Sequence, residues 1–434
     1  MEKFFELQKH GTNVSREILA GLTTFLTMAY ILAVNPGMLG SIGKGMTPEA
    51  VFTATAIASA IATLCMAFLA KLPVALAPGM GLNAFFTYTV VFGMGYSWQI
   101  ALTAVFLEGI LFIILSAFNV REAIVSAIPA NMKKAVAVGI GLFIALIGFS
   151  NAHIVVGGDG TILGLGKLAD PGVFLAIIGL VIIIVLHSLR VPGAILIGIL
   201  ATTILGIPMG ITKLPQTWKG PFSLPAAPLL FQFDFSSIIS FKFFTVFFTF
   251  LFVDIFDTVG TLVGVTTQAG LVDRNGNIPR LKQAFLSDAI GTVAGASLGT
   301  STVTSYVEST AGVAAGGRTG LTSLTTAILF LLALLFSPVF LLIPGAATAP
   351  ALIFVGFLMM TPVTEINFKD PTEGIPAFIA IVMMPFAYSI AEGIVYGVLS
   401  YVILKVVTRR FKEINVVTWL LFVVFILKVV LEGK

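Results

Sequence analysis

Apolar stretches long enough to cross a lipid bilayer recur along most of this chain. A helix needs about 20 mostly apolar residues to span the hydrocarbon core. A chain with many such stretches cannot fold as a water-soluble globule, so we expect an all-α polytopic membrane protein. The fourteen predicted segments, numbered in chain order, are 18–36, 50–70, 74–93, 98–118, 133–150, 172–188, 192–208, 243–265, 281–297, 300–316, 319–343, 347–361, 374–389 and 391–407.

The composition supports a membrane location. Hydrophobic residues make up 58% of the chain and charged residues 10%, whereas a soluble domain carries about 25% charged residues. Cys65 is the one cysteine, which excludes a disulfide framework and a cysteine metal site. The three histidines are scattered, and the net charge of +4 follows from basic loops. We therefore expect membrane lipid and a small molecule as partners, with no metal, no cofactor and no nucleic acid.

The basic residues predict how the chain lies in the membrane. If fourteen segments cross with the N-terminus in the cytoplasm, the loops on that side hold seventeen Lys and Arg residues and the other loops hold five. This is the positive-inside bias of multi-pass proteins in the cell membrane. Residues 1–17 are polar and give no sign of a cleaved signal peptide. A further apolar stretch, 415–431, follows a basic run, and the sequence leaves open whether it crosses.

The two halves of the chain carry traces of a repeat. The tripeptide Thr24–Leu26 in segment 1 is identical to Thr249–Leu251 in segment 8, an offset of 225 residues. The same offset takes Asn83, the amide of segment 3, to Glu308, the only acid of segment 10. Because seven is odd, two halves of seven segments have opposite orientations. The sequence therefore predicts a seven-plus-seven inverted repeat, the pattern of secondary transporters with a site near the midplane.

Segments 3 and 10 are predicted to be broken. Segment 3 has Pro and Gly residues ahead of Asn83, and the Ser/Thr/Val-rich front half of segment 10 favours a short strand over a helix. Irregular backbone at membrane depth is tolerated only where protein shields it or where it lines a cavity. A half-helix that starts there would offer N–H donors to a ligand. The residues expected to shape this site are Pro78, Gly79, Gly81, Thr304, Ser305, Ser309 and Gly312.

Acidic residues inside apolar segments are the candidate functional groups. Asp254 and Asp257 are three residues apart in segment 8, so a helix places them on roughly one face. Acids at membrane depth are costly and mark substrate or proton pathways, which favours function for this pair and for Glu308. The alternative is a structural pair tied to backbone or hydroxyl groups. For Asp288 in segment 9 both readings stay open, and Asn83 could simply cap a half-helix.

The chemistry of these groups indicates the kind of ligand. Acids and an amide, without a Lys or Arg inside segments 3, 8 and 10, disfavour an anionic substrate. A carboxylate accepts hydrogen bonds from a neutral heterocycle with adjacent N–H groups, and an amide serves both donors and acceptors. The same carboxylates can bind a proton on one side of the membrane and release it on the other. Sodium is the alternative coupling ion.

Three motifs, in order, resemble one known family. They are Ala77-Pro-Gly-Met-Gly-Leu-Asn83, Val253-Asp254-Ile-Phe-Asp257 and Thr304-Ser-Tyr-Val-Glu308. Together they closely resemble the AzgA-like purine nucleobase permeases, relatives of the uracil/xanthine permeases in the nucleobase–cation symporter-2 group. The resemblance covers essentially the whole chain. It implies a transporter and not an enzyme, which imports purine bases by proton symport with an elevator-like movement. Hypoxanthine and guanine are favoured, adenine is the other option, and related permeases suggest a homodimer.

The resemblance also implies a core and a gate domain and a set of site residues. We assign substrate binding to Asn83, Asp254 and Glu308, and proton coupling to Asp257 and Asp288, although the two aspartates of segment 8 could exchange roles. The expected division is core 1–120 and 243–345, gate 121–210 and 346–408, extracellular loop 211–242 and C-terminal segment 409–434.

Other functions remain as alternatives. A uracil/xanthine permease could use the same architecture. So could a sulfate- or bicarbonate-type anion carrier, but it predicts a basic residue at the break in segment 10. The nearest, Arg318, lies ten residues beyond Glu308. An intramembrane aspartyl protease needs its acids on two helices, whereas Asp254 and Asp257 share one.

Overall fold

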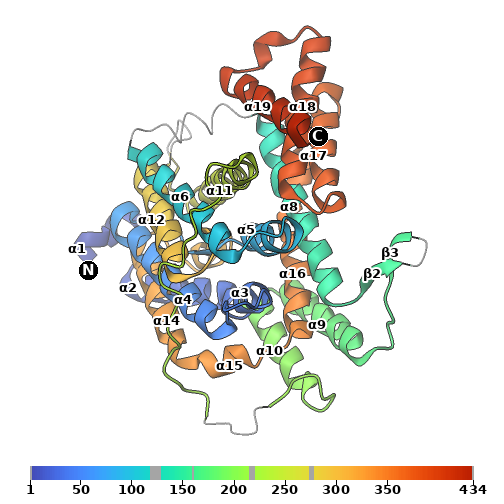
Figure 1. The fold of residues 1–434 in the computed structure, drawn as a ribbon. Helices are drawn as coiled ribbons and strands as arrows, with labels where there is room; N and C mark the ends of the chain where they lie inside the picture. Colours follow the sequence, from blue (N-terminus) through green and yellow to red (C-terminus); the bar gives the residue numbers. More distant parts are fainter. Residues whose placement is uncertain (1, 118–128, 159–160, 215–219, 273–277, 433–434) are drawn as a thin grey trace.

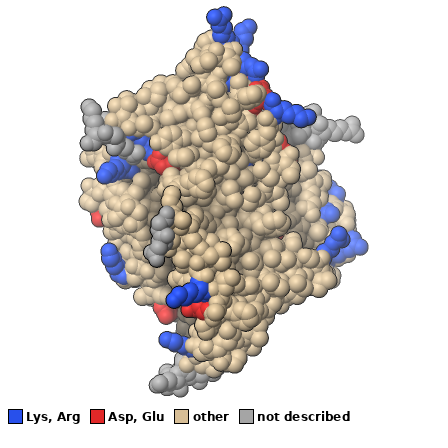
Figure 2. All heavy atoms as spheres, turned by 90° about the vertical axis from the view of Figure 1, so that its right-hand side faces the viewer, with Lys and Arg blue, Asp and Glu red and all other residues tan. Residues whose placement is uncertain are grey.

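The fold consists of helices that cross a membrane. The computed structural model describes residues 2–117, 129–158, 161–214, 220–272 and 278–432. Within these ranges, nine helices are long and apolar enough to span a bilayer, and four shorter ones are apolar as well. Most of the face shown in Figure 2 carries no charged side chain, as a lipid-facing surface requires. The predicted class of all-α polytopic membrane protein is confirmed.

Helices occupy the predicted segments. In the first half they are α1 (Glu2–Phe5), α2 (Val14–Met28), α3 (Ile31–Gly40), α4 (Pro48–Cys65), α5 (Met80–Ala84), α6 (Trp98–Ala117), α8 (Ala130–Asn151), α9 (Pro171–Ser188) and α10 (Ala194–Gly206). In the second half they are α11 (Phe241–Gln268), α12 (Leu281–Leu298), α13 (Ser309–Ala314), α14 (Gly320–Ala333), α15 (Ser337–Leu341), α16 (Gly345–Met359), α17 (Pro371–Phe386), α18 (Ile390–Val407) and α19 (Val416–Glu432). The strands are β1 (Leu76–Pro78), β2 (Val155–Gly158), β3 (Thr161–Leu165) and β4 (Val303–Ser305).

Three of the apolar helices, α4, α9 and α17, begin at the same local signal. Thr47, Asp170 and Asp370 each have extended backbone, and each side chain accepts a hydrogen bond from an N–H of the first helical turn. A proline follows each of them. Such a residue satisfies one of the N–H groups that a helix start leaves unpaired, and proline at the first position loses nothing because its missing N–H would have had no partner. These starts are therefore fixed locally.

The helices pack in two groups. One group contains α2, α3, α4, α6, α12 and α14, and the other contains α8, α9, α10, α16, α17 and α18. Figure 1 shows the first group at the left and the second at the right. The predicted boundary between residues 120 and 121 lies outside the described residues. The division into core and gate stays a prediction.

Glycines bring helices of the second group into backbone contact. A Cβ atom added at Gly141 on α8 would lie 2.7 Å from the carbonyl oxygen of Gly356 on α16, and one added at Gly356 would lie 2.5 Å from that of Gly141. Small residues at such crossings allow the close approach on which helix packing in membranes relies.

The C-terminal helix, which the sequence left open, runs antiparallel to α18. Near the end of α18, Lys405 Nζ lies 2.8 Å from Glu373 Oε1 and 2.5 Å from Glu413 Oε2, just before α19 begins. Near the start of α18, Glu392 is paired with Lys428 of α19. Ion pairs at both ends therefore hold α19 along the length of a helix that is itself long enough to span the membrane.

Candidate functional site

Two short strands from opposite halves of the chain meet inside the helical fold. Strands β1 and β4 pair antiparallel, with Leu76 opposite Ser305, Ala77 opposite Thr304 and Pro78 opposite Val303. They occupy the two segments that the sequence predicts to be broken. The half-helices α5 and α13 follow them directly, and α5 continues as a π-helix to Gly93. The predicted breaks are present in both segments.

Threonine side chains satisfy the outer edges of this strand pair. The Thr63 hydroxyl on α4 donates to Leu76 O at 3.1 Å and accepts from Leu76 N at 3.0 Å. The Thr292 hydroxyl on α12 does the same for Val303, at 3.1 and 3.3 Å. Unpaired backbone groups at membrane depth cost several kcal/mol each. The hydroxyls therefore allow two strands to exist where a sheet edge would otherwise be exposed to apolar surroundings.

A cavity lies beside the strand pair. Its volume is about 60 Å³, and it is lined from both broken segments and from α11 and α16. Both carboxylates and hydroxyls contribute to its wall, and no Lys or Arg does among the described residues. The lining residues are Tyr30, Gly79, Met80, Gly81, Asp257, Thr261, Thr304, Ser305, Tyr306, Val307, Glu308, Val355 and Met359.

Glu308 is held on one side of this cavity. The Tyr30 hydroxyl donates to Glu308 Oε1 at 2.5 Å, and the Thr27 hydroxyl lies 3.4 Å from the Glu308 carbonyl oxygen. Tyr30 is buried between α2 and α3, and sequence analysis did not select it. A second tyrosine of the cavity, Tyr306, donates to the Pro78 carbonyl oxygen at 2.5 Å. One carboxylate oxygen of Glu308 is thus engaged by the protein.

Asp257 lies on the α11 side of the same cavity. Its Oδ2 atom accepts a hydrogen bond from the Thr304 hydroxyl at 3.2 Å. Since Thr304 belongs to β4, this bond ties α11 to the strand pair. The tertiary structure thus brings Asp257 and Glu308, which are 51 residues apart in the sequence, to one cavity.

Asp254 and Asp288 lie together but away from the cavity wall. Both are fully buried, and the Thr258 hydroxyl is 3.2 Å from Asp254 Oδ1 and 2.7 Å from Asp288 Oδ1. One hydroxyl has a single proton to donate. A proton on either carboxyl group would allow both contacts to be hydrogen bonds. The substrate contact predicted for Asp254 remains a prediction, and this geometry favours a role with Asp288.

Asn83 connects the two broken segments. It is fully buried, its Nδ2 atom lies 3.4 Å from the Pro78 carbonyl oxygen, and its Oδ1 atom accepts from the Ser301 hydroxyl. Asn83 is not among the residues that line the cavity. Its predicted contact with substrate is therefore untested, whereas its position favours shaping of the strand pair.

The residues predicted to shape the site lie at close contacts. A Cβ atom on Gly79 would lie 3.0 Å from the Thr304 hydroxyl oxygen, and one on Gly81 would lie 2.6 Å from Ile140 on α8. A Cβ atom on Gly312 would overlap Thr24 of α2. The Ser309 hydroxyl accepts from Ala75 N at 3.0 Å, next to β1.

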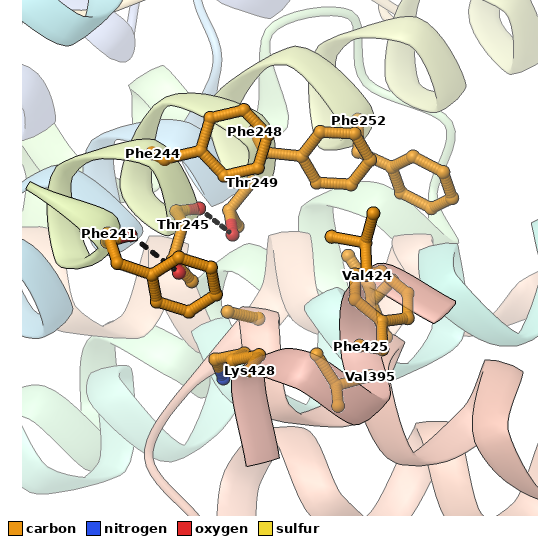
Figure 3. A pocket seen from close by; sticks show the side chains of 12 residues that line it. Phe241, Phe244, Thr245, Phe248, Thr249, Phe252, Val395, Val424, Phe425 and Lys428 are labelled. Atoms are coloured by element: carbon orange, nitrogen blue, oxygen red, sulfur yellow. Dashed lines mark hydrogen bonds between the residues drawn. The ribbon is translucent and has the colours of Figure 1, made fainter. Parts of the chain in front are cut away.

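A second, apolar cavity lies between α11, α18 and α19. Its volume is about 20 Å³, and Figure 3 shows the phenylalanine rings of α11 opposite Val395, Phe425 and Lys428. The rings of Phe248 and Phe252 stack with centroids 5.7 Å apart. None of its lining residues lines the Glu308 cavity.

In the described residues, no group of three or more His, Cys, Asp and Glu side chains could hold a metal ion.

The fold is that of known membrane transporters. It matches the transmembrane domain of a cyanobacterium bicarbonate transporter, BicA, with a TM-score of 0.67 and 15% identity, covering 89% of this chain and 97% of that one. It also matches SLC26A9 with a TM-score of 0.64 and 12% identity, covering 94% of this chain and 66% of that one. At these identities the likeness shows the fold alone.

The sequence identifies the family. Residues 15–396 match the family model Xan_ur_permease, described as the Permease family, so the chain belongs to that family of transporters and is not an enzyme. The chain is 46% identical to the guanine/hypoxanthine permease PbuG of Bacillus subtilis, over 98% of this chain and 99% of that protein. It is 43% identical to the adenine permease AdeQ of Escherichia coli, over 99% and 96% respectively. The predicted family resemblance is confirmed.

Proposed function

We propose that this chain is a secondary active transporter that imports a purine nucleobase together with protons. The observation that carries the proposal is the cavity at the strand pair, which Asp257 and Glu308 flank. Relatives named as guanine/hypoxanthine and adenine permeases supply the substrate class. A neutral heterocycle with N–H donors suits a cavity lined by carboxylates, which accept hydrogen bonds.

The cavity has unused hydrogen-bonding capacity for such a ligand. Tyr30 engages Glu308 Oε1, which leaves Oε2 to accept from an N–H of the base. The Ser305 hydroxyl is buried, lines the cavity and has no hydrogen-bond partner among the described residues. A buried polar group without a partner costs free energy unless a ligand or water satisfies it. We assign to Ser305 a hydrogen bond with the base.

Proton coupling is assigned to the acids of α11 and α12. Asp257 contacts both the cavity and β4, so its protonation would change the cavity wall directly. Asp254 and Asp288 share the Thr258 hydroxyl one turn away. Asp257 therefore links ligand binding to the protonation of this cluster.

The architecture proposed with this function has two inverted halves and two domains. Thr63 and Thr292 make the same pair of bonds to β1 and β4, one in each half, which supports the seven-plus-seven repeat. The two groups of packed helices support a core, 1–120 with 243–345, that moves against a gate, 121–210 with 346–408. The excess of Lys and Arg in the loops on one side supports a cytoplasmic N-terminus. The homodimer stays a prediction.

An anion carrier is the second candidate, because BicA and SLC26A9 share the fold. The absence of Lys and Arg among the described residues of the cavity wall argues against it.

The test of purine transport is uptake of radiolabelled hypoxanthine by cells that express the chain, with adenine, guanine, xanthine, uracil and sulfate as competitors. We expect competition by purines and inhibition by a protonophore. Lack of purine uptake would refute the proposal, and competition by sulfate or uracil would favour an alternative.

Asp257→Asn is expected to separate transport from the proton gradient. The amide keeps the shape of the side chain but no longer binds and releases a proton. Residual uptake should therefore become insensitive to protonophore and to external pH. The measurement is initial uptake rate between pH 5.5 and 8, with Thr261→Ser, another cavity residue, as the control. Uptake by Asp257→Asn with the pH response of the unmodified chain would contradict the assignment.

A further inference from the structure

A separate cavity with strongly basic walls lies at the helix ends near the N-terminus. Its volume is about 120 Å³. The N-terminal segment forms one wall, and the end of the α4 region, the residues before α12 and the start of α14 form the others. Among the described residues that line it, the side chains that can carry charge are Glu6, Lys9, His10, Lys71, Arg280 and Arg318.

The one acid of this set balances only part of the positive charge. Glu6 Oε2 lies 2.8 Å from Lys9 Nζ, and Glu6 Oε1 lies 4.0 Å from an Arg280 nitrogen. The hydrogen bond from Lys9 holds the pKa of Glu6 below its usual value, so Glu6 stays ionised at neutral pH. Its single negative charge leaves the wall with a net positive charge.

The remaining cations contact neutral groups. Lys71 Nζ donates to the Phe4 carbonyl oxygen at 2.7 Å, and an Arg318 nitrogen donates to the Val313 carbonyl oxygen at 2.6 Å. A backbone carbonyl accepts a hydrogen bond but does not neutralise a cation. The walls therefore favour a negatively charged occupant.

Three of the lining residues have a left-handed backbone. The φ angles are 55° for Glu6, 56° for Lys71 and 54° for Arg280. Residues other than glycine adopt this region at a cost, and such residues concentrate at ligand sites and switch regions. Each of the three is a cap residue at a helix end, so three helix ends meet at this cavity.

An apolar surface adjoins the cavity. Phe68 and Leu69, at the end of the membrane-spanning stretch Pro48–Ala70, are 46% and 40% exposed. Phe4 of α1 is 47% exposed, and its ring centroid lies 6.0 Å from that of Phe68. Lys71 Nζ lies 4.1 Å from the centre of the Phe4 ring, so cavity and apolar surface meet. A cluster of cations beside exposed apolar side chains matches the two parts of a phospholipid, its anionic headgroup and its acyl chains.

We propose that this cavity binds the phosphate of an anionic phospholipid, with the acyl chains along Phe4, Phe68 and Leu69. Lys9 and Arg280, which come from the N-terminal segment and from the start of α12, would both contact the phosphate. A bound lipid would then join these two parts of the protein and stabilise the fold. The proposal does not depend on which substrate is transported.

The test is thermal unfolding of the purified full-length chain in detergent. We expect phosphatidylglycerol to raise Tm by about 3 °C, as a ligand that binds only the folded state does, and phosphatidylcholine to have no such effect. Arg280→Gln and Lys9→Gln should each abolish the rise. The matched control is Arg190→Gln, which removes the same charge from an exposed arginine that also has a left-handed backbone, with φ 58°, and should keep the rise.

Three results would overturn the lipid site. They are an equal rise with phosphatidylcholine, an equal rise with inorganic phosphate alone, and an equal rise in Arg280→Gln and Arg190→Gln. Melting of each variant without lipid shows whether it is folded. Because uptake is not the readout, failure of the lipid site would leave the proposed transport function unaffected.

Discussion

Glu308→Gln is expected to weaken purine binding by about 10- to 150-fold while the protein remains folded. A hydrogen bond to a charged group contributes about 1.5–3 kcal/mol, which corresponds to that range of affinity. Glutamine keeps the shape and can still accept from Tyr30, but its amide donors would face the N–H groups of the base. The measurement is KM for uptake, together with calorimetric binding of hypoxanthine to the purified chain.

Glu108→Gln is the matched control for this prediction. Glu108 is also a buried glutamate that accepts from a hydroxyl, that of Thr302 at 2.9 Å, but it does not line the cavity. Its replacement should leave KM unchanged, whatever it does to stability. An equal KM for the two variants would show that Glu308 does not contact the substrate.

Glu17→Ala is expected to destabilise the fold by about 3–5 kcal/mol, because it removes a charged acceptor from several donors and each buried group left unsatisfied costs about 1–3 kcal/mol. Glu17 belongs to α2, and its fully buried carboxylate lies against the start of α14. It accepts from the N–H of Arg318 at 2.9 Å, and from the N–H and hydroxyl groups of both Thr319 and Thr322. These donors include N–H groups that a helix start leaves unpaired, and alanine would leave the buried Thr319 N–H and hydroxyl without this acceptor.

The measurement is the midpoint of unfolding in detergent, with Glu49→Ala as the control. Glu49 also lies in the first turn of a helix, α4, but is exposed, so its loss should change stability by no more than about 0.5 kcal/mol. Equal midpoints for the two variants would disprove the role of Glu17. Glu17→Ala molecules that remain folded should bind hypoxanthine with unchanged affinity.

Much of the fold follows from local sequence because the membrane leaves few choices. Backbone groups in lipid must be paired within the segment, so each apolar run became a helix. Segments 3 and 10 were the exceptions. Their breaks were predicted from Pro78 and Gly79 in segment 3 and from the threonine-rich run before Glu308 in segment 10. The hairpin of β2 and β3 was not predicted, since its short strands lie in a glycine-rich loop and leave no periodic signal.

The members of the site were less accessible to sequence reasoning. Tyr30 and Glu308 are 278 residues apart and meet only because α13 packs against α2. In the sequence, Glu17 is one more acid of a polar N-terminus. Only the fold shows that the first turn of α14 packs against its carboxylate. No local periodicity encodes contacts of this kind.

The sequence by itself determined the membrane class, the broken segments and the acidic residue types, because lipid penalises every unpaired polar group and so makes each one visible in an apolar run. Only the tertiary structure decided which acid faces the cavity. Asp254 and Asp257 lie within one turn of α11, and the packing of α12 and β4 around that helix buries the first against Asp288 and leaves the second beside Glu308. That choice depends on contacts between segments distant in sequence, and these form only when the helices assemble.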